Sequence, residues 1–195
     1  HVETAAGRPA HIATVLEGLG YLLEPSIDPR NRFAHRFRRG ADTVDVGAET
    51  VDVVAADHVA PSRVERLRGY DMVPIAGGTQ ALRRTVNAIV TIGHAPVVIS
   101  VPTAFGALIL KSAAHQVDSR DKARHLTDAA TLLACIADPF TVRDQAPSGS
   151  DTRRLRHLAD HLGDPTDPAW MTLENSARRR GQAALRVLAG STDTT

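Results

Sequence analysis

The spacing of apolar and polar positions changes about half-way along the chain. Up to residue 101, apolar residues mostly alternate with polar ones or form short β-branched runs, which is typical of strands. This half predicts a helix over 9–20 and strands over 21–24, 33–39, 50–54, 85–92 and 97–101. From Thr103 onward the apolar residues recur at helical spacing. That pattern predicts helices over 103–117, 120–137, 151–163 and 168–188.

The change of pattern predicts an α+β protein in two parts. We expect residues 1–101 to form an α/β part and residues 102–195 to form a helical bundle. Pro139 should end the second helix of the bundle, because proline cannot continue a helix. The longest apolar run, 104–110, is too short to span a bilayer, so we expect no membrane partner.

Composition narrows the class of protein only a little. The net charge is +1, so bulk electrostatic binding of nucleic acid is not expected, and any RNA contact must come from a local patch. The single cysteine, Cys135, excludes an internal disulfide and fits the reducing cytoplasm. It lies on an apolar helix, where we expect a small core residue.

Two opposite charges stand within apolar helical stretches. Lys111 is one of two lysines in the chain and follows an apolar run, and Asp128 occupies an equivalent place on the next predicted helix. A charge on the inner shoulder of a helix is costly unless it is paired or binds a ligand. The pattern therefore suggests one polar site between the two helices. The pair is either a buried structural ion pair or a site where the lysine acts as a point charge for a triphosphate.

Two other motifs have simpler interpretations. The sequence Gly77-Gly-Thr79 resembles a phosphate-binding glycine turn, but no acidic pair follows about ten residues on, so we expect a loop that leads into the next element. His157 and His161 are one helical turn apart, which is also a metal-ligand spacing. No third ligand is evident in the sequence. A solvated helix face is therefore favoured over a zinc site.

Several stretches together resemble one family. Asp52 lies on a predicted strand, Lys111 ends Gly106-Ala-Leu-Ile-Leu-Lys111, and Asp128 ends Lys122-Ala-Arg-His-Leu-Thr-Asp128. With the stretches 35–39, 51–58, 77–84 and 149–156, this pattern resembles the AbiEii-type nucleotidyltransferase toxins. It is most similar to actinobacterial members, including the MenT toxins of MenAT toxin–antitoxin systems. The resemblance covers about residues 2–170.

The resemblance implies a polymerase-β-like nucleotidyltransferase fold followed by a helical part. It also implies Mg²⁺-dependent transfer of a nucleotide from an NTP to the 3′ acceptor end of tRNA, and a cognate antitoxin as partner. By position Lys111 and Asp128 match the functional lysine and aspartate of the family, and Asp52 matches a strand carboxylate that acts in catalysis or assists a metal. The family's Gly-Ser turn and Asp-x-Asp strand are absent from this sequence. We expect them just before His1, in a segment upstream of the chain.

Basic side chains near these positions are the candidates for RNA and nucleotide contacts. Arg36, Arg38 and Arg39 form a dense basic stretch, which is either an RNA-binding surface or a solvated edge strand. Lys122 and Arg124 are further RNA-binding candidates, and Arg120 is a nucleotide-binding candidate at the start of the Asp128 helix. These three residues could equally be the usual charged first turn of a helix. Two alternative functions stay open: a catalytically silent binding module of the same fold, and a nucleotidyltransferase that modifies small molecules.

Overall fold

The computed structural model of the chain describes residues 9–40, 48–59, 66–145 and 149–190. Contacts divide the chain into two compact units, 1–79 and 80–195. The sequence predicts a boundary after residue 101, whereas this division falls at Thr79. The difference arises because the strands over 85–102 form a hairpin whose second strand contacts the following helix, so the hairpin belongs to the second unit. The expected α+β class is confirmed.

The first unit contains short strands and one longer helix. Helix α1 spans Pro9–Gly18, and β1 (Leu22–Glu24), β2 (Arg36–Arg39) and β3 (Glu49–Asp52) form an antiparallel sheet in the order β1-β2-β3. A separate parallel pair consists of β4 (Ala55–Ala56) and β5 (Pro74–Ile75). The core is built from α1, the sheet and the following loops, with Ala13, Leu16, Phe37, Val53, Ala55, Leu67 and Met72 buried.

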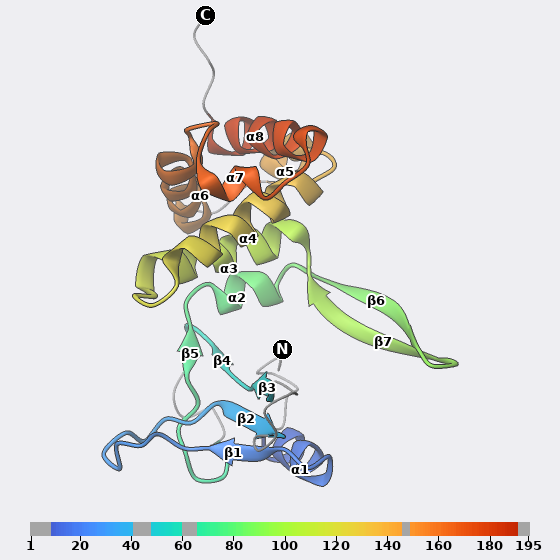
Figure 1. Cartoon of the computed structure of the whole chain (residues 1–195), viewed down its shortest axis with the longest axis vertical. Coiled ribbons are helices and arrows are strands. Elements are labelled where there is room, and N and C mark those ends of the chain that lie inside the picture. The colour runs from blue at the N-terminus through green and yellow to red at the C-terminus, as the bar shows by residue number, and fades with distance from the viewer. Residues whose placement is uncertain (1–8, 41–47, 60–65, 146–148, 191–195) are drawn as a thin grey trace, which may run out of the picture. The chain divides into compact units, whose positions relative to one another are not determined.

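A long hairpin opens the second unit. The short helix α2 spans Gly78–Leu82, and β6 (Thr85–Ile92) then pairs antiparallel with β7 (Ala95–Pro102) along its whole length. The β-branched residues of both strands favour this conformation, and Gly93 supplies the positive φ of 63° that the turn requires. Figure 1 shows the hairpin extending from the helices of its unit. Its large apolar side chains, such as Ile89 and Val98, are exposed.

The helices after the hairpin form the larger core. They are α3 (Ala104–Val117), α4 (Lys122–Cys135), α5 (Pro139–Asp144), α6 (Gly149–Leu162), α7 (Pro168–Met171) and α8 (Asn175–Ala189). Figure 1 shows α3 and α4 side by side, and α4 also contacts α6, α7 and α8. Trp170 is fully buried among these helices, and its indole N–H donates to the carbonyl of Leu162 at 3.0 Å. No helix in the described part of the chain is long and apolar enough to cross a membrane.

Two helix predictions differ from the structure. Pro139 does end the second predicted helix, but it also begins α5, because the Asp138 carboxylate caps that helix by accepting from the N–H groups of Phe140 and Thr141. The helix predicted over 168–188 is divided into α7 and α8 at residues 172–174. Apolar periodicity continues across such a break, so the pattern alone does not show it.

Candidate functional site

Lys111 of α3 and Asp128 of α4 meet across the contact between the two helices. The Lys111 Nζ donates to Asp128 Oδ2 at 2.5 Å. The contact that the sequence predicts is therefore present. The two side chains are 33% and 34% exposed, so solvent and ligands reach both partners. The pair does not have the deep burial of a structural ion pair that locks two helices together.

The local sequence determines this placement. The Thr103 hydroxyl begins α3 by accepting from the N–H of Gly106, and the Asp121 carboxylate begins α4 by accepting from the N–H of Arg124. Each helix then buries an apolar stripe, including Leu108 and Ile109 on α3 and Ala129, Ala130 and Leu133 on α4. Lys111 and Asp128 lie at the edges of these stripes, where their charged ends remain accessible.

The start of α4 adds exposed basic side chains near the pair. Arg124 is one turn before Asp128, a spacing that puts both on the same side of the helix. Arg120, Lys122 and Arg124 are all exposed, and none of them takes part in an ion pair found among the described residues. This end of α4 therefore has cations available for an anionic ligand.

Asp52, the candidate for metal binding and catalysis, lies in the first unit and has a cationic partner. It is directly opposite Arg36 across β2 and β3, and the guanidinium donates to both carboxylate oxygens, at 2.8 and 2.9 Å. The hydrogen bonds from Arg36 lower the pKa of the Asp52 carboxyl, although partial burial works in the opposite direction. Asp52 is thus an ionised carboxylate whose two oxygens are already engaged.

The described residues do not fit a Mg²⁺ site at Asp52. Mg²⁺ needs a nearly octahedral set of oxygen ligands, usually with one or two carboxylates and a substrate phosphate. Among the described residues, the only converging group of three or more His, Cys, Asp or Glu side chains consists of histidines. The role of Asp52 in metal binding stays a prediction, and it requires acids other than the described ones.

The candidate RNA-binding arginines of β2 are likewise paired. Arg38 lies 3.3 Å from Glu24, and Arg39 lies 2.6 Å from Glu49 and stacks over the ring of Tyr21. With the Arg36–Asp52 pair, each arginine of this strand has an acidic cross-strand partner. The structure therefore favours a solvated, ion-paired strand over an RNA-binding surface here, although β2 is the central strand of the sheet and not the edge strand that the sequence suggested. The exposed cations at the start of α4 are the stronger candidates.

The main chain of the Gly77-Gly-Thr79 turn binds a carboxylate of the protein itself, that of Asp57. Asp57 accepts from the main-chain N–H of Gly77 at 2.7 Å and from that of Thr79 at 2.9 Å. Gly77 has a φ of 82°, and a Cβ on Gly78 would lie 2.9 Å from the main chain of Ala56, so both glycines are required. The turn leads directly into α2, as the sequence predicts.

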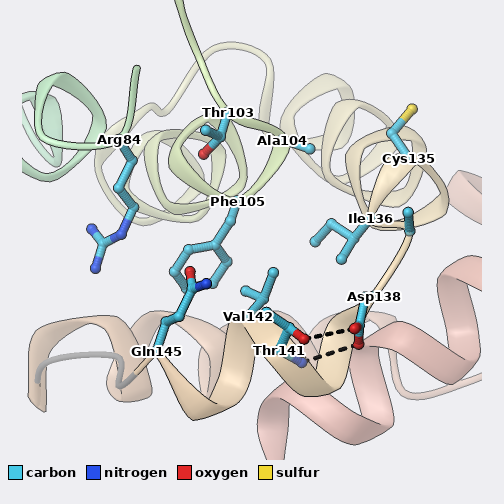
Figure 2. A pocket seen from close by; sticks show the side chains of 11 residues that line it. Arg84, Thr103, Ala104, Phe105, Cys135, Ile136, Asp138, Thr141, Val142 and Gln145 are labelled. Carbon is cyan, nitrogen blue, oxygen red and sulfur yellow. Dashed lines mark hydrogen bonds between the residues drawn. The ribbon is translucent and has the colours of Figure 1, made fainter. Parts of the chain in front are cut away.

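Sequence reasoning missed a pocket of about 510 Å³ in the second unit. Figure 2 shows its lining side chains coming from the start of α3, the end of α4 and α5. Most of the pocket lining is apolar, and Arg84 is the basic side chain among the lining residues. The Arg84 guanidinium lies 5.2 Å from the centre of the Phe105 ring and donates to the fully buried Asp151 at 2.7 Å. Cys135 is exposed and lines this pocket, so the core position expected for it is wrong.

The pocket and the Lys111–Asp128 pair lie along the same pair of helices. Ala104 and Cys135 line the pocket, seven residues before Lys111 and seven residues after Asp128. Seven residues are about two helical turns, or ~10 Å, and bring a side chain back to nearly the same side of a helix. The accessible ion pair and the apolar pocket could therefore serve two ends of one ligand.

No known protein-family model, curated protein or solved structure matches this chain. The chemistry of the site therefore has to be inferred from its own residues. The similarity to the AbiEii-type toxins remains a prediction from the sequence.

Proposed function

We propose that this chain is a nucleotidyltransferase toxin that transfers a nucleotide from an NTP to the 3′ end of tRNA and so blocks translation. The proposal includes the polymerase-β-like fold of the family that the sequence resembles. The observation that carries it is the Lys111–Asp128 contact, which is accessible at the edge of two helices and has the exposed Arg124 one turn before Asp128. A cognate antitoxin would be its partner.

In this proposal Lys111 binds the β- and γ-phosphates of the NTP. Its Nζ is already held by Asp128, so the ammonium is oriented before the nucleotide arrives. The hydroxyl oxygen of the tRNA end attacks the α-phosphorus in line, the bond to the β-phosphate oxygen breaks, and pyrophosphate leaves while the hydroxyl proton passes to solvent. The positive charge of Lys111 stabilises the negative charge that develops on the leaving group.

Arg124 and Arg120 would add positive charge for the phosphates, and Lys122 would contact the RNA backbone. The apolar pocket beside Phe105 would take the nucleoside, about two helical turns from the phosphates. The single cysteine, at the pocket, offers a site-specific probe of this arrangement. NTP should slow the alkylation of Cys135 at neutral pH, and an unchanged alkylation rate at saturating NTP would place the nucleoside elsewhere.

The decisive experiment uses the full-length protein with Mg²⁺, each α-labelled NTP in turn and total tRNA. Lys111→Ala should abolish labelling of tRNA with folding unchanged, and Asp128→Ala should reduce it strongly. Arg143→Ala is a matched control because it removes another partly exposed ion pair of the same unit, that of Arg143 with Asp144. This control should label tRNA at the wild-type rate.

Other outcomes distinguish the alternatives. Wild-type labelling by Lys111→Ala would contradict the proposal. Nucleotide binding that depends on Lys111, without label on any acceptor, would indicate a catalytically silent module; the pairing of Asp52 with Arg36 is the observation in its favour. Label on small hydroxylated molecules rather than tRNA would indicate a small-molecule nucleotidyltransferase.

A further inference from the structure

The third ligand that the sequence did not reveal for His157 and His161 comes from another helix. His115 of α3 lies against both of them on α6, with ring centres 5.0 Å from His157 and 4.7 Å from His161. One candidate ligand nitrogen from each ring lies within 4.8 Å of the others. These three residues are the histidine cluster.

The geometry points to a Zn²⁺ site formed by the histidine cluster. Zn²⁺ binds imidazole nitrogen at about 2.0–2.1 Å in tetrahedral geometry, which places ligand nitrogens ~3.4 Å apart. The His115 Nδ1 and His157 Nε2 atoms are 2.7 Å apart, closer than this spacing, and one ligand nitrogen from each of the three rings lies within 4.8 Å of the others. Small side-chain rotations therefore bring all three nitrogens to a common metal.

The hydrogen bonds of the cluster already resemble those around a metal ligand. The Nδ1 of His161 lies 2.8 Å from the carbonyl oxygen of His157, and a carbonyl can only accept, so Nδ1 carries the proton. In the neutral ring the Nε2 of His161 then keeps its lone pair, as in many metal sites where a carbonyl orients the histidine. The His115 Nδ1 and the His157 Nε2 lie within hydrogen-bond distance, so one of these two ring nitrogens donates and the other accepts.

Burial and charge suit neutral ligands. His115 is 5% exposed and His157 is partly buried, whereas His161 is exposed, so the solvated helix face predicted for His157 and His161 fits His161 alone. Burial lowers the pKa of His115 and of His157, and the neighbouring histidines lower it further. Imidazole must be neutral to bind a metal, so this environment favours the ligand form at neutral pH. The other charges that act on the cluster are Lys122, His125 and the carboxylate of Asp160.

The two helices hold the cluster in a fixed register. Ser112 of α3 is fully buried, and its hydroxyl donates to the carbonyl of Arg154 on α6 at 2.8 Å. This bond lies three residues before His115 on one helix and three residues before His157 on the other, so it fixes the relative height of the two rings. His161 is exposed, which leaves the site open to solvent. The fourth position of the metal would then be taken by water.

The test uses metal alone, so its result does not depend on nucleotide or tRNA. The full chain, freed of metal with a chelator, is titrated with Co²⁺ as a spectroscopic substitute for Zn²⁺. We expect one equivalent to bind, with the visible absorption of a four-coordinate Co²⁺ centre, and one equivalent of Zn²⁺ to displace it. Millimolar Mg²⁺ should displace nothing, because imidazole is a poor ligand for Mg²⁺.

Three variants locate the site. His161→Ala removes an exposed side chain and His157→Gln keeps a side chain of similar length, so both should fold. Each should weaken Zn²⁺ binding by at least about 100-fold, since loss of even an outer partner of a ligand costs about 10–100-fold. His94→Ala, in the exposed hairpin turn, is the matched control and should bind as the wild type does.

Melting curves with and without Zn²⁺ give a second measurement. Zn²⁺ should raise the melting temperature of the wild type and of His94→Ala, and should leave that of His161→Ala unchanged. Wild-type Zn²⁺ affinity in His161→Ala and His157→Gln would overturn the proposal. Failure of the wild-type chain to bind one equivalent would also overturn it.

Discussion

Two of the ion pairs in the second unit, Lys111–Asp128 and Arg84–Asp151, should differ strongly in their contribution to stability. In the Lys111–Asp128 pair both side chains are about one-third exposed, whereas Asp151, the partner of Arg84, is fully buried. Partly exposed pairs typically contribute about 0.2–1 kcal/mol because solvent screens them. Breaking a pair with a buried carboxylate typically costs about 3–5 kcal/mol. Arg84 itself is 27% exposed and can regain some water, so the lower end of that range is expected.

The test replaces each carboxylate with the amide of the same shape. Asp128→Asn should lower the free energy of unfolding by less than about 1 kcal/mol, and Asp151→Asn should lower it by roughly 3 kcal/mol. Urea unfolding at neutral pH, followed by circular dichroism, measures both changes at the urea midpoint. An equal loss in the two variants would refute the reasoning, because Lys111–Asp128 would then be a structural pair and not an accessible site.

Two further predictions test the packing and the turn. Gly181→Ala should destabilise the protein by roughly 1–2 kcal/mol, although alanine favours a helix by about 1 kcal/mol, because its Cβ would lie 2.8 Å from the buried Trp170 ring. Gly18→Ala, whose Cβ meets nothing within 4 Å at the end of α1, should be neutral to mildly stabilising. Equal melting temperatures of the two variants would contradict this. Burial raises the pKa of the Asp57 carboxyl, but the hydrogen bonds from Thr79 and Gly77 together lower it by more. The pKa is therefore below its ordinary value. The stabilisation by Asp57 is therefore present above about pH 4 and lost as the pH falls below it. Asp57→Asn should weaken this loss in urea unfolding between pH 5 and pH 3, and an unchanged pH dependence would contradict it.

Local pattern was sufficient for most of the secondary structure. The hairpin of β6 and β7 follows from two β-branched runs around Gly93, and α3 and α4 follow from their apolar periodicity. Elements without such signals were missed. The parallel pair β4–β5 is too short to show a period, and α5 begins at a proline that also ends the helix before it.

Sequence separation explains which parts of the sites could be predicted. Lys111 and Asp128 are 17 residues apart on consecutive helices, and antiparallel neighbours joined by a short loop must face each other, so the sequence itself determined their contact. His115 and His157 are 42 residues apart, and Arg84 and Asp151 are 67 apart. Periodicity determines which face of a helix is apolar, but not which helix packs against it. Only the tertiary structure decided that His115 lies against α6 and that Arg84 reaches the buried carboxylate, because those contacts depend on how all the helices share one core.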